Sequence, residues 1–273
     1  MYNYKIIAYI DILGFQNEIN KRTVSDNKEN ENETTRVYDF ISLINKDFVD
    51  KKRKKLIETT YEVTQFSDSL VISYLFNEKA SVFQILLSLL FLHIDAIMYG
   101  FLIRGVVTAG LFVHDDDHIF GPAMNIAHKV EDEISIYPRI IVDKELLDIA
   151  YNNPLHENGQ GAELDCIEEL LRIDFDGFYY LDYLNQGCEL IMEEYGYEGL
   201  PDYFHAIAKI IDDNEMEDNF RIVQKYNWLK GKYNSALKKY KEFGLTGDAH
   251  KRQVSEKLGE QRDFRNSFSK KSK

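Results

Sequence analysis

Two aspartates occur in or beside segments that are otherwise apolar and are expected to form strands. Asp11 lies within AYIDILGFQ, a run typical of a buried strand, and Asp68 lies in the turn of FSDSL. An unpaired buried carboxylate is costly, so Asp11 needs either a partner or a chemical task. Two carboxylates on adjacent strand ends, with main-chain carbonyls nearby, would suit Mg²⁺ or Mn²⁺ holding a triphosphate. The alternative is that each aspartate only caps its turn.

A third segment carries polar residues at helical spacing. Pro122 and Asn125 mark a turn into a helix that we expect to run through about residue 134. Asn125 and Lys129 are four residues apart, so on a helix they share one face.

These segments together resemble the class III nucleotide cyclase homology domain, over roughly residues 4–185. Each motif is weak by itself, but the motifs occur in the family's order and on the expected elements. The resemblance implies an α+β fold with a palm-like or ferredoxin-like mixed sheet and helices, here followed by a C-terminal helical appendage. The motifs that carry it are Ile10–Phe15, Ser67–Asp68, Arg104–Gly110 and Gly121–Lys129.

The resemblance also implies roles for individual positions. Asp11 and Asp68 match the two metal-binding aspartates, and Ile12 matches the residue whose carbonyl completes a site for two Mg²⁺ or Mn²⁺ ions. Asn125 matches the asparagine that orients the ribose and helps to stabilise the transition state. Lys129 occupies the place of the catalytic arginine, keeping the positive charge but losing the bidentate fork.

The positions that read the base depart from the purine-specific members of the family. Thr64, four residues before Asp68, replaces the lysine of adenylate cyclases, and His118, seven residues before Asn125, replaces their aspartate. A pocket without either purine pair favours a pyrimidine. Tyr61 lies near the same strand and either stacks on a small base or belongs to the core.

In these departures and in the appended charged helices the chain most resembles the pyrimidine cyclases of Pycsar anti-phage defence. That resemblance implies conversion of UTP, favoured over CTP, to its 3′,5′-cyclic monophosphate and pyrophosphate, as a second messenger for a separate effector. It also implies a homodimer with shared active sites. Arg104 is an alternative source of catalytic charge, or a strand-edge ion pair. A purine cyclase, a cyclic-dinucleotide synthase and an inactive interaction module remain open.

Composition bears on nucleic-acid binding, cellular location and membrane insertion. The 273 residues carry a formal net charge of −13, which argues against broad binding of nucleic acid. Two isolated cysteines, Cys166 and Cys188, fit no zinc spacing and indicate a reduced, cytoplasmic protein. No signal peptide is expected, because the N-terminus lacks a basic region and Asp11 interrupts its apolar stretch. The apolar segment 82–103 is interrupted by His93 and Asp95, and we expect a buried helix that continues into a strand, with no membrane insertion.

Hydrophobic periodicity predicts an α+β sandwich with helices on one face of the sheet. A cyclase domain over 1–195 and a charged helical region over 196–273 are expected, with a boundary near 195–201 and a basic tail over 251–273. A mobile loop rich in Asn and Glu is expected at about 20–36. The expected elements are a strand at 5–11, a helix at 37–49, a hairpin at 59–74, a helix at 82–98, a strand at 101–113, a helix to about 134, a strand at 139–143, a helix at 144–151 and a strand at 175–184.

Overall fold

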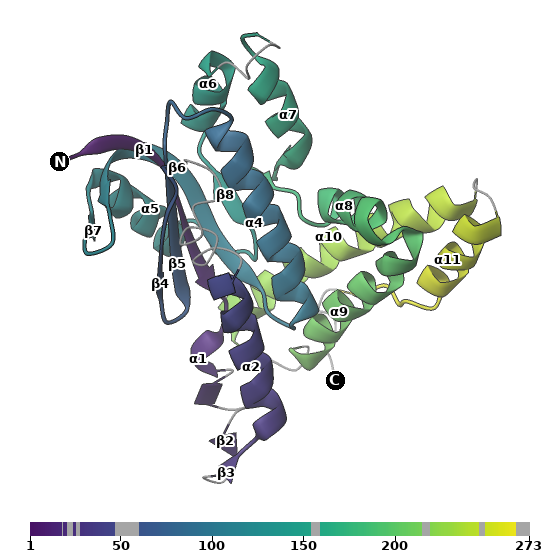
Figure 1. Ribbon diagram of the computed structural model, residues 1–273. Helices are drawn as coiled ribbons and strands as arrows, with labels where there is room; N and C mark the ends of the chain where they lie inside the picture. The colour runs from purple at the N-terminus through teal and green to yellow at the C-terminus, as the bar shows by residue number, and fades with distance from the viewer. Residues whose placement is uncertain are drawn as a thin grey trace. The chain divides into compact units, whose positions relative to one another are not determined.

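The computed structural model shows a mixed α and β protein made of two compact units (Figure 1). Unit 1 contains Met1–Ser135 and Arg139–Leu181, and unit 2 contains Ile136–Pro138 and Asp182–Lys273. The residues that the structure describes are 1–17, 19–20, 24–25, 28–46, 60–153, 159–214, 219–245 and 249–265.

Unit 1 is organised around an eight-stranded mixed sheet in which β7 pairs with β6 and the others follow the order β4-β5-β1-β6-β8-β10-β9. The β6–β8 pair is parallel and the other pairs are antiparallel. The hairpin expected over 59–74 is confirmed as β4 and β5. The strands are β1 (Asn3–Ile12), β4 (Glu62–Phe66), β5 (Ser69–Leu75), β6 (Ile103–His114), β7 (Ile119–Phe120), β8 (Ile140–Val142), β9 (Leu171–Ile173) and β10 (Tyr179–Leu181).

One face of this sheet is covered by α2 (Glu31–Ile44) and α4 (Ser81–Met98). Ile44 of α2 and Leu92 of α4 lie beside Ile10 of β1, and α4 crosses in front of the sheet in Figure 1. Helix α4 confirms the helix expected at 82–98. Among the described helices it is the one long and apolar enough to cross a membrane, yet 56% of that window is buried inside the protein.

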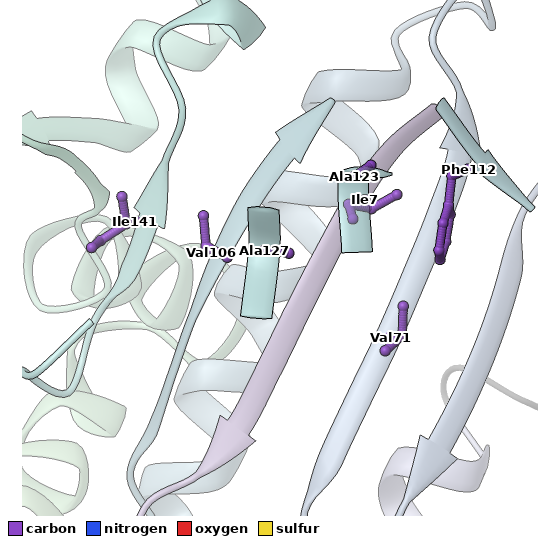
Figure 2. Close-up of a cluster of buried hydrophobic side chains, with 7 residues drawn as sticks. All are labelled: Ile7, Val71, Val106, Phe112, Ala123, Ala127 and Ile141. Carbon is purple, nitrogen blue, oxygen red and sulfur yellow. The ribbon is translucent and has the colours of Figure 1, made fainter. Parts of the chain in front are cut away.

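The opposite face is covered by α5 (Pro122–Glu133), so the expectation that all helices lie on one face is wrong. A single residue, Gly121, separates β7 from α5, and the helix must therefore begin where the end of β6 and β7 bring the chain. Figure 2 shows the apolar cluster that results; its members are Ile7, Val71, Val106, Phe112, Ala123, Ala127 and Ile141.

The polar stretch expected as a loop over 20–36 is helical from Glu31 onward. Glu31 and Glu33 lie in the first turn of α2, where negative charge is favourable, and Arg36 pairs with Glu33 at 2.9 Å. Residues 21–23 and 26–27 of that stretch lie outside the described residues. The two-residue strands β2 (Val24–Ser25) and β3 (Lys28–Glu29) lie between and after them, and α1 (Phe15–Asn17) comes earlier in the chain.

The later part of unit 1 contains α6 (Glu145–Asn152) and α7 (Ala162–Leu170) before β9 and β10. The strand expected over 175–184 is confined to β10, because Asp174 and Asp176 form a turn instead. The buried Arg139 pairs with both carboxylates and holds this turn in place.

Unit 2 is helical and begins earlier in the chain than the expected boundary near 195–201. Helix α8 belongs to it because Cys188 is fully buried there and Tyr240 donates a hydrogen bond to the Asn185 carbonyl at 3.0 Å. The boundary expected from composition followed a change in charge along the sequence, whereas the packing of α8 determines where unit 2 begins. Its helices are α8 (Asn185–Tyr195), η3 (Tyr197–Gly199), α9 (Leu200–Asp213), α10 (Phe220–Leu245) and α11 (Ala249–Gly259).

We predict that Gly105→Ala destabilises the protein by about 3 kcal/mol, because the new Cβ would overlap the main-chain oxygen of Tyr9 and lie 3.0 Å from the Ile10 Cα atom. Strand β1 cannot yield without disturbing both of its neighbours. Gly231→Ala is the matched control: nothing lies within 4 Å of its Cβ on α10, so helix propensity should make it neutral or stabilising. Urea unfolding of both variants is the measurement, and equal midpoints would contradict the close approach of β6 to β1.

Candidate functional site

Asp11 and Asp68 lie at the same end of the sheet. Asp11 is opposite Ser69 in the β1–β5 register, and the Ile12 amide donates a hydrogen bond to the Asp68 carbonyl at 3.0 Å. The last residues of β1 therefore lie against the turn between β4 and β5. The structure thus places the main chains of the three residues expected to hold a metal beside one another, although α1, β2, β3, α2 and β4 lie between Ile12 and Asp68 in the sequence.

The Asp11 carboxylate has a partner in Arg104, which faces it from β6 in the strand register. Arg104 Nε donates to Asp11 Oδ2 at 3.1 Å. The same guanidinium contacts Glu131 of α5, with 2.5 Å between Nη2 and Oε1, and donates from Nη1 to the Ser135 carbonyl at 3.1 Å. Arg104 therefore forms an ion pair at the strand end, one of the two roles that the sequence left open for it.

The charges of Asp11, Asp68 and Glu131 act on a common neighbour, Tyr9. Burial raises the pKa of Tyr9, and these three carboxylates raise it further, whereas its hydrogen bond to Ser69 opposes the shift. The pKa of Glu131 is also raised, mainly by burial and against the effect of Arg104. Three carboxylates act on Tyr9, and only Asp11 and Glu131 among them contact Arg104, so this end of the sheet has an excess of acidic groups.

The donor chemistry fits a hard divalent cation. Asp11 and Asp68 carry carboxylate oxygens, the ligands that Mg²⁺ and Mn²⁺ prefer, and both carboxylates act on Tyr9. Over the described residues, no three His, Cys, Asp or Glu side chains converge as a metal-binding group. A cation here would depend on two carboxylates, one of which already contacts Arg104.

Asn125 and Lys129 share an exposed face of α5, as their spacing predicts. Ala123 and Ala127, on the other side of this helix, are buried in the cluster that packs on the sheet. Within one chain the structure therefore turns Asn125 and Lys129 away from the sheet that carries Asp11. It does not bring these two groups of residues together.

Thr64 contacts His114, and His118, the other residue expected to read the base, pairs with Asp115 instead. His114 Nε2 lies 2.9 Å from Thr64 Oγ1, and His114 Nδ1 lies 2.9 Å from Ser73 Oγ. His118 lies in the turn before β7, where it pairs with Asp115 at 3.0 Å and its side chain is 64% exposed. The strand register alone would not predict the His114 contacts, because Ser73 and Ile7 lie in line with Thr108, and His114 lies beyond Phe112, the last residue of β6 that pairs with β1.

Tyr61 belongs to the other face of the sheet. Its ring lies 5.1 Å from that of Tyr74, and burial raises its pKa. Thr64 is opposite Val71, and Tyr74 lies three residues further along β5, so Tyr74 and Thr64 point to opposite faces. Tyr61 is therefore a partly buried tyrosine that packs against Tyr74.

Glu131, Lys5 and His114 were not among the residues predicted from the sequence. Glu131 follows Ala123 and Ala127 at intervals of four residues, so a charge on the buried stripe of α5 was the available signal. Lys5 is 5% exposed and donates to the His114 carbonyl at 3.1 Å. A charged residue inside a strand expected to be central was the corresponding signal for Lys5.

We predict that His114→Ala lowers the free energy of unfolding by about 2 kcal/mol, because it leaves the buried Ser73 hydroxyl without its ring partner. His118→Ala should change stability by less than about 0.5 kcal/mol, because its side chain is largely exposed. Thermal unfolding of both variants distinguishes the two histidines. A larger loss for His118→Ala would contradict the placement of His114.

Comparison with known proteins assigns no family to this chain. The sequence matches no protein-family model, and no curated protein is detectably similar to it. A function must therefore be argued from the site itself and from the resemblance in its motifs.

Proposed function

We propose that this protein is a nucleotide cyclase that converts a pyrimidine nucleoside triphosphate to its 3′,5′-cyclic monophosphate and pyrophosphate. The observation that carries the proposal is the meeting of Asp11 with the Asp68 turn at one end of the sheet. In this reaction the ribose O3′ forms a bond to the α-phosphorus, and the bond from that phosphorus to the departing pyrophosphate breaks. A site with acidic residues beside an arginine suits a substrate that arrives with divalent cations.

The topology of the first four large strands supports the palm-like part of this proposal. In chain order the elements are β1, α2, β4, β5, α4 and β6, and in space the strands are ordered β4-β5-β1-β6. This is the arrangement of a ferredoxin-like βαββαβ unit. Asp11 and Asp68 lie at the end of the sheet where the cyclase resemblance would put the metal site.

The expected site residues have different roles in the proposed chemistry. Asp11 and Asp68, with the Ile12 carbonyl, would hold Mg²⁺ or Mn²⁺, two ions in each site. Bound ions would supply positive charge to the triphosphate and acidify the ribose hydroxyl. Lys129 and Asn125 would stabilise the charge that develops on the phosphate oxygens. Arg104 is held by Asp11 and Glu131, so any effect that it has on the site would act through Asp11.

The exposed position of Asn125 and Lys129 supports a homodimer with shared sites. Because both residues face away from the sheet of their own chain, a second copy is the simplest source of the missing half-site. The cyclic nucleotide would then diffuse in the cytoplasm to a separate effector, as in Pycsar-type anti-phage defence.

For the base we propose UTP ahead of CTP. The Thr64 hydroxyl bonds to His114 and can still donate or accept one further hydrogen bond, which either pyrimidine can satisfy. A purine cyclase is the alternative enzyme. An inactive cyclase-like module is the alternative without chemistry, and the Asp11–Arg104 contact favours it, because the guanidinium occupies one of the two carboxylates.

We predict that Asp11→Asn and Asp68→Asn each abolish cyclisation, because each removes one of the two carboxylates available to a cation. The wild-type protein is incubated with Mn²⁺ and each of the four ribonucleoside triphosphates, and products are identified by mass spectrometry. UTP should turn over fastest. Asp115→Asn, in the exposed turn, is the matched control and should keep wild-type turnover. Preference for ATP or GTP would refute the choice of base, and no cyclic product from any triphosphate would refute the cyclase.

We predict that mixing Asp11→Ala with Asn125→Ala restores part of the activity that each lacks by itself. In a mixed dimer one of the two shared sites would contain neither substitution, so up to about half of the wild-type rate is expected for that species. Subunit exchange is verified with differently tagged chains. Absence of any recovery after confirmed exchange would show that the two groups of residues do not share a site.

A further inference from the structure

Arg104 contacts three groups in different ways. The Ser135 carbonyl accepts a hydrogen bond from Nη1 and Asp11 accepts one from Nε, each at 3.1 Å, whereas Glu131 Oε1 lies 2.5 Å from Nη2 as an ion pair without hydrogen-bond geometry. Loss of the Asp11 contact would leave the guanidinium held by Glu131 of α5 and by Ser135, two residues beyond the end of that helix. Loss of Glu131 would leave Asp11 as the one carboxylate among these three groups.

The surroundings make these contacts strong. The side chains of Arg104, Asp11 and Glu131 are 20%, 18% and 8% exposed, so water screens their charges only partly. Glu131 is the most buried of the three, and removing one member of such a cluster leaves an uncompensated charge behind.

We propose that Arg104 competes with a divalent cation for Asp11, and that Glu131 is a positioning residue that limits this competition by drawing the guanidinium toward α5. The inference rests on the proposed cation site at Asp11 and Asp68. The affinity of that site for the cation then depends on whether the Arg104 guanidinium pairs mainly with Asp11 or with Glu131. Glu131 favours the cation without touching it.

The inference specifies how substitutions combine. Arg104→Gln removes the competitor and should tighten Mn²⁺ binding about tenfold, whereas Glu131→Gln leaves Arg104 to Asp11 and should weaken it about tenfold. Because Glu131 acts through Arg104, the Glu131→Gln substitution should have a much smaller effect when Arg104→Gln is already present. A carboxylate that acted only through its own charge would weaken binding equally in both backgrounds.

The test measures Mn²⁺ binding to the full chain without nucleotide, by electron paramagnetic resonance of free Mn²⁺. Wild type, Asp11→Asn, Asp68→Asn, Arg104→Gln, Glu131→Gln and the Arg104→Gln/Glu131→Gln double variant are compared. Arg172→Gln, on the edge strand β9, is the control for loss of a positive charge and should leave Mn²⁺ affinity unchanged. Circular dichroism verifies folding. If Arg104→Gln does not fold, Arg104→Lys replaces it, because a single ammonium cannot reproduce the three separate contacts and should reduce the effect of Glu131→Gln.

The outcomes separate the inference from the proposed function. Tighter binding by Arg104→Gln, with an effect of Glu131→Gln that depends on Arg104, supports the inference. Binding that requires Asp11 and Asp68 but is indifferent to Arg104, or equal effects of Glu131→Gln in both backgrounds, overturns the inference and leaves the cation site. No Mn²⁺ binding by wild type, or binding that Asp11→Asn does not weaken, overturns both.

Discussion

Unit 1 depends on the enclosure of β1. This strand pairs with β5 on one side and with β6 on the other, and helices cover both of its faces. A strand enclosed on all sides must be apolar along its length, and Ile6, Ile7 and Ala8 have no exposed surface. Charge is accommodated only toward its two ends, at Lys5 and at Asp11.

Both ends of β1 place their charge on the face that α5 covers, and each gives it partners. Lys5 donates to the carbonyl of His114, whose ring bonds to Ser73, and Asp11 pairs with Arg104. Charges buried without such partners would destabilise the fold strongly. Between the two ends lies the apolar cluster of Figure 2. The apolar centre of this face stabilises the sheet, and its two ends carry the charged and polar side chains that could take part in chemistry.

Helix α5 has two faces with different tasks. Ala123 and Ala127 pack on the sheet, and Glu131 continues the same stripe down to Arg104. The other face presents Asn125 and Lys129 to solvent. In the proposed cyclase, one helix would thus support the acidic end of its own sheet and offer polar groups to the site of a second copy. The contact of Glu131 with Arg104 forms within one chain, whereas Asn125 and Lys129 would reach a site only when two copies associate.

Local sequence was sufficient for several of the elements, although the beginning of α2 at Glu31, and α7 and β9, were not predicted. Alternation and helical periodicity predicted β1, the β4–β5 hairpin, α4 and α5, and they placed Asp11 and Asp68 at strand ends, because these signals arise from neighbouring residues. Tertiary structure alone decided that Arg104 faces Asp11, that Thr64 meets His114, that α5 covers the second face, and that α8 packs with unit 2. Each of these depends on strand register or on the path of a connection. A slip of one residue would turn every side chain of a strand to its other face, and residues as far apart as Asp11 and Arg104 carry no local mark of the register that joins them.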